Sequence, residues 1–109
     1  MGKVKTVKLD NDGTPVTVTV ERASAKRGIM RYRLMLADEV TDEDLRYITM
    51  FVYPNLAAGT TSVDGLYWPL TAEQVAELPE QLVTGWLEAV YEVNPNWEPR
   101  RPDDSEKKE

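Results

Sequence analysis

Residues 78–97 read LPEQLVTGWLEAVYEVNPNW, and this stretch predicts one long helix with a defined start and a defined end. Pro79 is tolerated in the first turn of a helix, whereas Pro95 stops it, because an internal proline lacks the N–H donor and clashes with the preceding turn. The large apolar residues come as adjacent pairs that repeat at helical spacing. These pairs are Leu82 and Val83, Trp86 and Leu87, and Val90 and Tyr91. A stripe this broad must be buried against the rest of the chain or against another protein.

The stripe contains two rows at four-residue spacing. We expect the first row, Leu82, Trp86 and Val90, to pack inward against a helix around Leu45. The second row and two aromatic residues of the preceding loop would then edge a groove for apolar helices of a partner protein. The residues of this candidate site are Val83, Leu87, Tyr91, Tyr67 and Trp68. The alternative that both rows are simply buried stays open, since amphipathic helices commonly carry stripes of this width.

The N-terminal residues predict an antiparallel β-hairpin. Residues 15–21, PVTVTVE, alternate Val with Thr, and residues 3–9 also show a period of two. Such alternation of β-branched residues is typical of strands. Between the two segments lies the turn sequence DNDGT, in which Gly13 can adopt a positive φ.

The basic segment that follows, residues 23–40, fits both helical and strand spacing. Because Ala, Lys, Arg, Leu and Met are good helix formers and are abundant here, we predict a helix from about Ala25 or Gly28 to Asp38.

Two later helix starts carry capping signals. Thr41-Asp-Glu-Asp44 offers an N-cap threonine followed by acids, and Pro54 is expected to end the helix that begins there. Thr71-Ala-Glu-Gln74 offers a full capping box for a short helix that Pro79 breaks. The connection between these helices, residues 55–70, is expected to be a loop whose apolar end, Leu66 to Trp68, folds back on the helices.

These elements predict an α+β fold, with an N-terminal β-hairpin followed by three to four helices. Residues 1–97 are expected to form a single globular domain. Residues 98–109, EPRRPDDSEKKE, lack large apolar side chains and are predicted to be a disordered charged tail.

The charge is distributed unevenly along a chain of net charge −6. Residues 1–33 hold eight Lys or Arg against three acids, which gives +5, whereas residues 34–97 hold eleven acids against Arg46, which gives −10. The acidic body disfavours nucleic-acid binding. The asymmetry is typical of a solvated acidic face that aids solubility, and the alternative is head-to-tail self-association of the basic end with the acidic body. Neither a signal peptide nor a membrane-spanning run is present, and the absence of cysteine suits a cytoplasmic protein.

Residues suited to catalysis or metal binding are scarce. The chain has no histidine, and none of its three serines lies in a nucleophile-elbow sequence. The spacing of Asp10, Asp12 and Glu21 resembles a calcium-binding loop, but Pro15 stands where that loop needs glycine, so we interpret the segment as a hairpin turn. We therefore expect a non-enzymatic protein with no catalytic, cofactor-binding or metal site.

The β-hairpin, the basic linker and the last thirty residues together resemble the tail assembly chaperones of long-tailed, siphovirus-type bacteriophages. The residues that carry this resemblance are Leu78-Pro79-Glu80, Ala89-Val90, Asn94-Pro95 and Trp97. The resemblance implies a protein of the host cell cytoplasm that binds the tape measure protein, and keeps it soluble during tail assembly. Two alternatives remain: a structural or connector protein of the phage particle, and an acidic inhibitor that mimics DNA.

Overall fold

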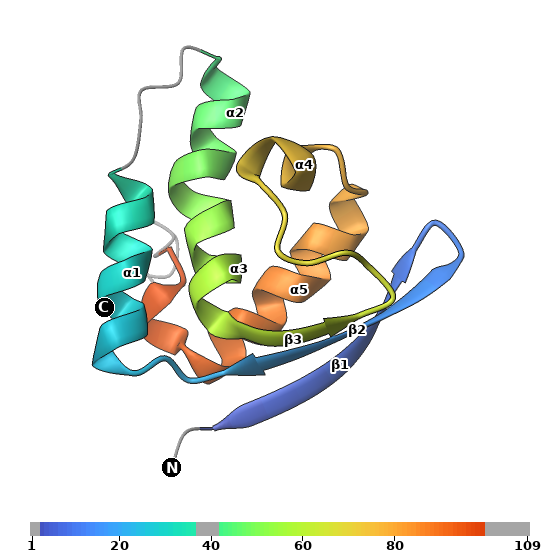
Figure 1. The fold of residues 1–109 in the computed structure, drawn as a ribbon, viewed down its shortest axis with the longest axis horizontal. Coiled ribbons are helices and arrows are strands. Elements are labelled where there is room, and N and C mark those ends of the chain that lie inside the picture. Colours follow the sequence, from blue (N-terminus) through green and yellow to red (C-terminus); the bar gives the residue numbers. More distant parts are fainter. Residues whose placement is uncertain (1–2, 37–41, 100–109) are drawn as a thin grey trace, which may run out of the picture.

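The computed structural model describes residues 3–36 and 42–99. The elements, in chain order, are β1 (Val4–Asn11), β2 (Thr14–Glu21), α1 (Ala25–Met35), α2 (Glu43–Tyr47), a π-helical segment η1 (Ile48–Val52), α3 (Tyr53–Gly59), β3 (Thr60–Asp64), α4 (Ala72–Ala76), α5 (Glu80–Val93) and a 3-10 turn η2 (Pro95–Trp97). The strands form one antiparallel sheet in the order β1-β2-β3, and the helices lie on one side of it (Figure 1). The predicted α+β fold is confirmed. Most of the charged C-terminal segment lies outside the described residues.

The predicted hairpin is confirmed with its turn. Asp12 and Gly13 have φ values of 50° and 94°, so both adopt the positive φ that a two-residue hairpin turn requires. The Asp10 carboxylate accepts a hydrogen bond from the Gly13 N–H, which fixes the turn. The valines of β2 (Val16, Val18 and Val20) all face the core and are fully buried. The alternation in β2 therefore places the hairpin against the helices.

The expectation that residues 55–70 form a loop is wrong in its first half. Residues 55–59 belong to α3, and Thr60–Asp64 form β3, which pairs with β2. The pairing has an irregularity between Thr19 and Val20. Because β3 is short and rich in hydroxyl side chains, its sequence resembles a loop, and only the neighbouring strand provides its hydrogen-bond partners. The apolar end of the connection does fold back, since Leu66 and Trp68 pack against the core.

The expectation that Pro54 ends a helix is also wrong. The helical path runs from Glu43 to Gly59 and contains the π-helical segment η1 just before α3. A proline in an α-helix would lack its hydrogen bond and clash with the carbonyl four residues earlier. A π turn widens the helix at that position and changes the hydrogen-bond partners, so the chain continues through Pro54 without a break.

The capping predictions are confirmed except at one residue. Thr71 and Gln74 form the expected capping box of α4, with each side chain bonded to the other residue's backbone N–H. Helix α1 begins at Ala25 as predicted, with Ser24 as its N-cap, but it ends at Met35, before the predicted end at Asp38, which lies outside the described residues. In α2 the N-cap is Asp42, whose carboxylate accepts from the Leu45 N–H; the predicted cap, Thr41, lies outside the described residues.

Helix α5 lies across the sheet and carries the centre of the core. Leu82, Trp86 and Val90 are buried as predicted, and Trp86 donates from Nε1 to Thr60 Oγ1 at 2.9 Å. The expected burial of Leu45 is wrong, because Leu45 is only half-buried and lies outside the core. Helix α5 packs against β1, β2 and α3, and α3 is the later part of the helical path that contains Leu45. Within the part of the chain that the structure describes, no helix is both long and apolar enough to cross a membrane.

Candidate functional site

An open cleft of about 460 Å³ lies where α4, α5 and the α2–η1 segment meet. Figure 1 shows α4 between α2 and the N-terminal end of α5. We call this feature the α4–α5 cleft; it is lined by Tyr47, Ile48, Val52, Val75, Ala76, Leu78, Glu80, Val83, Thr84 and Leu87. Most of these side chains are apolar, so the cleft offers a surface that water solvates poorly.

Buried residues from two elements anchor the floor of the cleft. Val52 at the end of η1 and Val75 in α4 both belong to the core. Helix α4 has only five residues, but its capping box holds Val75 and Ala76 in place. Leu78 follows directly, and Pro79 then begins α5, so the two helices enclose one side of the cleft. The cleft is therefore a preformed part of the fold.

The mouth of the cleft carries an exposed aromatic side chain. Tyr47 is 57% exposed, and its ring lies 5.3 Å from that of Phe51, which is also exposed. The two residues are four positions apart along the same helical path, so they form a pair on its surface. Large aromatic side chains in this position are enriched at protein interfaces.

Two acidic residues border the cleft. Glu80 lines it, and Glu77 lies between two lining residues, Ala76 and Leu78. Helices α2, α4 and α5 hold six acids against one base, Arg46. An apolar cleft with an acidic rim attracts a segment that combines apolar and basic side chains.

Two of the five predicted site residues lie in the cleft. Val83 and Leu87 line it, and both are half-buried and packed against the core on one side. Their four-residue spacing on α5 brings them to one face of the helix, as the sequence predicts. Each of the two side chains therefore contacts the core and also lines the cleft.

The other three predicted residues lie elsewhere. The Trp68 ring packs on that of Trp86, with 5.0 Å between centroids, so Trp68 covers the core. Tyr67 is 77% exposed and does not line the cleft. Tyr91 accepts a hydrogen bond at its hydroxyl from Asn55 Nδ2 at 3.0 Å, and so belongs to the contact between α3 and α5. The structure does not join these residues into one groove.

Sequence reasoning missed several residues of the cleft, among them Tyr47, Ile48 and Leu78. Tyr47 and Phe51 have the spacing of an exposed apolar pair, which was a usable signal. Leu78 and Ala76 carried no such signal, because only the turn between α4 and α5 brings them to the cleft.

The buried polar side chains of the described residues are all hydrogen-bonded. No buried side-chain N or O atom among them lacks a hydrogen-bond partner, and no three His, Cys, Asp or Glu residues gather as metal ligands would. Burial raises the pKa of the Tyr91 hydroxyl above its ordinary value, while the hydrogen bond from Asn55 acts in the opposite direction. A raised tyrosine pKa keeps this group neutral, and it lies outside the cleft.

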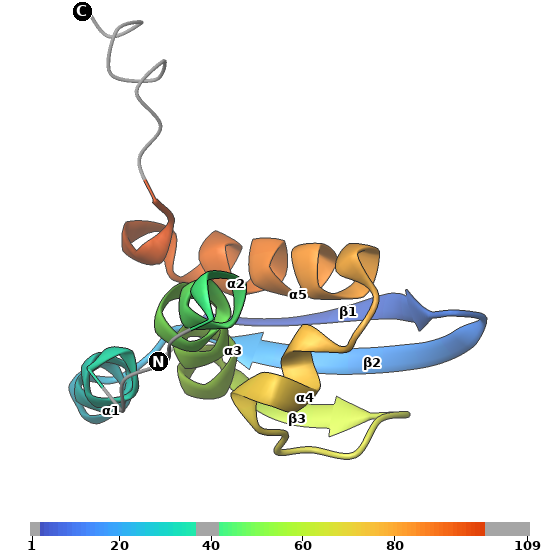
Figure 2. The ribbon, with the colours of Figure 1, turned by 90° about the horizontal axis from the view of Figure 1, so that it is seen from above.

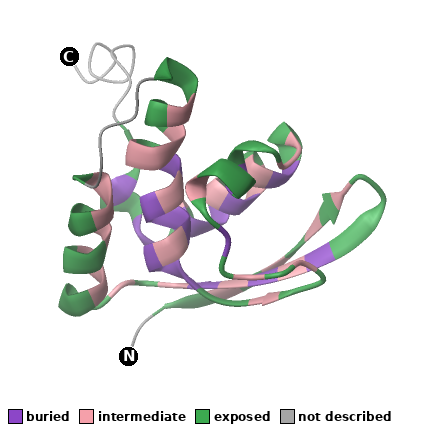
Figure 3. Cartoon of the chain, turned by 45° about the horizontal axis from the view of Figure 1, so that its top comes forward, coloured by how far each residue is buried: buried purple, intermediate pink, exposed green. Residues whose placement is uncertain are grey.

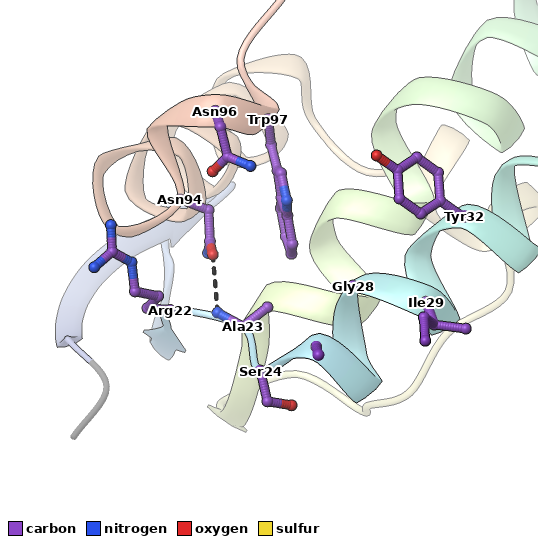
Figure 4. Close-up of a pocket in the computed structure, with 10 residues that line it drawn as sticks. Arg22, Ala23, Ser24, Gly28, Ile29, Tyr32, Asn94, Asn96 and Trp97 are labelled. Atoms are coloured by element: carbon purple, nitrogen blue, oxygen red, sulfur yellow. Dashed lines mark hydrogen bonds between the residues drawn. The ribbon is translucent and has the colours of Figure 1, made fainter.

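A second pocket, of about 340 Å³, lies between the start of α1 and the C-terminal end of α5. Trp97 and Tyr32 lie on opposite sides of it (Figure 4). Asn94 accepts from the Ala23 N–H at 2.9 Å and donates to the Glu21 carbonyl at 3.1 Å. These bonds tie the end of α5 to the segment between β2 and α1, so Asn94 is explained as a structural link.

Comparisons of the chain with protein-family models, curated proteins and solved structures found no match.

Proposed function

We propose that the chain is a non-enzymatic helix-binding protein, a tail assembly chaperone that binds the tape measure protein of a long-tailed bacteriophage and keeps it soluble during tail assembly. On this proposal it works in the cytoplasm of the infected host cell. The α4–α5 cleft is the binding site, and the ligand is an amphipathic helix of the partner.

The observation that carries the proposal is the apolar character of an open, preformed cleft. Helix-in-groove binding needs a hydrophobic groove that accepts side chains spaced three or four residues apart. Val83 and Leu87 supply such a wall from α5, and Tyr47 supplies an exposed aromatic edge from the opposite side. Exposed apolar surface of this kind marks interaction sites on proteins.

The charge of the chain supports a solubilising role. The net charge of −6 opposes aggregation of the complexes that the chain forms with an apolar partner, because like-charged surfaces repel. The absence of histidine and cysteine is consistent with a protein that binds and performs no reaction.

Co-expression with the tape measure protein of the same phage tests the proposal. We expect the chain to raise the soluble fraction of the tape measure protein and to co-purify with it. Leu87→Asp should abolish both effects, because it places a charge on the apolar wall of the cleft. Gln81→Asp is the matched control, since it puts the same charge at an exposed position of α5 outside the cleft lining. Equal loss in both variants, or no loss in either, would contradict the proposed site.

A structural or connector protein of the phage particle is the main rival. Mass spectrometry of purified particles separates the two roles, since a chaperone is absent from the finished particle and a connector is present. Presence at a constant number of copies per particle would overturn the chaperone role.

A further inference from the structure

Helix α1 carries an apolar and basic face that the other described residues leave uncovered. None of its residues is buried. Ile29 is 57% and Leu36 84% exposed, and Met30 is exposed as well. Figure 3 shows exposed residues along the outer side of α1. Lys26 and Arg33 lie on this side too, and with Arg27, Ile29 and Met30 they line a surface depression of about 540 Å³. We call Lys26, Ile29, Met30, Arg33 and Leu36 the outer face of α1.

Two arginines fix α1 to its own chain. Arg27 donates from Nη2 to the Thr60 carbonyl at 3.0 Å. Arg31 donates to the Asn55 side-chain oxygen, and its guanidinium lies 4.7 Å from the centre of the Trp97 ring. These bonds hold α1 against α3, so its outer face points away from the molecule and cannot enter the cleft of the same chain.

The outer face matches the α4–α5 cleft in chemistry. Ile29, Arg33 and Leu36 follow the four- and three-residue spacing that a groove for a helix accepts. The apolar side chains fit the apolar wall around Val83 and Leu87, and Lys26 and Arg33 fit the acidic rim.

We propose that the outer face of α1 of one copy docks in the α4–α5 cleft of a second copy of this chain. The proposal rests on the proposed function, in that it takes the cleft as a groove for helices. Figure 2 shows α1 at one end of the molecule, with α3 between it and α4. The contact joins two different surfaces, so one copy can use both, and association continues past a dimer unless a ring closes. The partner helix and a neighbouring α1 then compete for one cleft, which stays covered until the partner displaces α1.

Charge-swap variants test the docking by sedimentation velocity at low and physiological salt. The wild-type chain should self-associate, and association should weaken as salt rises, because the charged rim is exposed to solvent. The double variant Lys26→Glu/Arg33→Glu should weaken association at least about tenfold, since like charges then meet across the contact. Glu77→Lys/Glu80→Lys should do the same from the cleft side.

A mixture of the two double variants should regain association, because each outer face then meets a cleft rim of opposite charge. Lys3→Glu/Lys8→Glu is the control, since it makes the same change of charge just before β1 and within it, and should leave association unchanged. A monomeric wild-type chain at every salt concentration, equal weakening by the control, or a mixture that stays dissociated would each overturn the docking.

Binding of the tape measure protein separates this inference from the proposed function. The Lys26→Glu/Arg33→Glu variant should still bind that protein, and more tightly than wild type if α1 competes for the cleft. A monomeric wild-type chain that binds the tape measure protein through Leu87 overturns the docking alone. Charge-restored self-association without any binding of the tape measure protein supports the docking and overturns the proposed function.

Discussion

The hydrogen bond between Trp86 and Thr60 makes a sharp prediction about stability. Thr60→Val replaces the hydroxyl with a methyl group of similar size, so packing changes little. Trp86 Nε1, whose 2.9 Å bond to Thr60 Oγ1 is buried, is then left without an acceptor. An unsatisfied buried donor costs about 1–3 kcal/mol. For a domain of this size, that lowers the midpoint of thermal unfolding by roughly 5–15 °C.

Thermal and urea unfolding, followed by circular dichroism, measure this effect. Thr61→Val is the matched control, because it makes the same change at the next residue, where the hydroxyl is exposed and water can replace its bond to the Thr19 carbonyl. We expect the control to change the free energy of unfolding by less than about 0.5 kcal/mol.

A double-mutant cycle with Trp86→Phe isolates the bond. In the Trp86→Phe background no indole N–H remains, so Thr60→Val should be nearly neutral or stabilising. If Thr60→Val is as stable as wild type, or costs the same in both backgrounds, the buried bond does not hold α5 to β3 and the account of the core is refuted.

Two further perturbations follow from the packing and the pKa shift. Gly59→Ala should destabilise the fold, because the added Cβ would lie 2.8 Å from Val90 Cγ1. Gly28→Ala is the contrast, since its Cβ meets open space in α1 and the change should stabilise the fold by up to about 1 kcal/mol. Equal midpoints of thermal unfolding for the two variants would contradict this packing. The pKa of Tyr91 is raised in the folded state, so its contribution to stability is fully present below the unfolded pKa near 10 and is lost as pH rises through the folded value. Urea unfolding between neutral and alkaline pH should therefore show a smaller alkaline loss of stability in Tyr91→Phe, and an unchanged pH slope would contradict the shift.

The sequence predicts those elements whose pattern is local. The alternation in Val16, Val18 and Val20 and the row of Leu82, Trp86 and Val90 identify a buried face from spacing alone, and both rows are buried. The box of Thr71 and Gln74 is equally local, since its bonds join residues three positions apart.

The errors occur where tertiary contacts decide. Pro54 stays within a helical path because the preceding turn is π-helical, and no single-residue preference signals that change. Thr60–Asp64 becomes a strand because β2 has an edge to pair with. The spacing of Val83 and Leu87 on one helix predicted that they line a groove. Tyr47 and Leu78 line the same cleft only because α4 packs beside η1, and that contact cannot be predicted from local spacing.

The most direct test of a helix-binding cleft is a map of methyl NMR shifts on addition of a helical fragment of the tape measure protein. The proposed function predicts that the signals of Ile48, Val75, Val83 and Leu87 shift together and saturate, while those of Val16 and Val18 in the sheet stay in place. Saturating binding with shifts confined to residues outside the cleft, or no shift at any concentration, would contradict it.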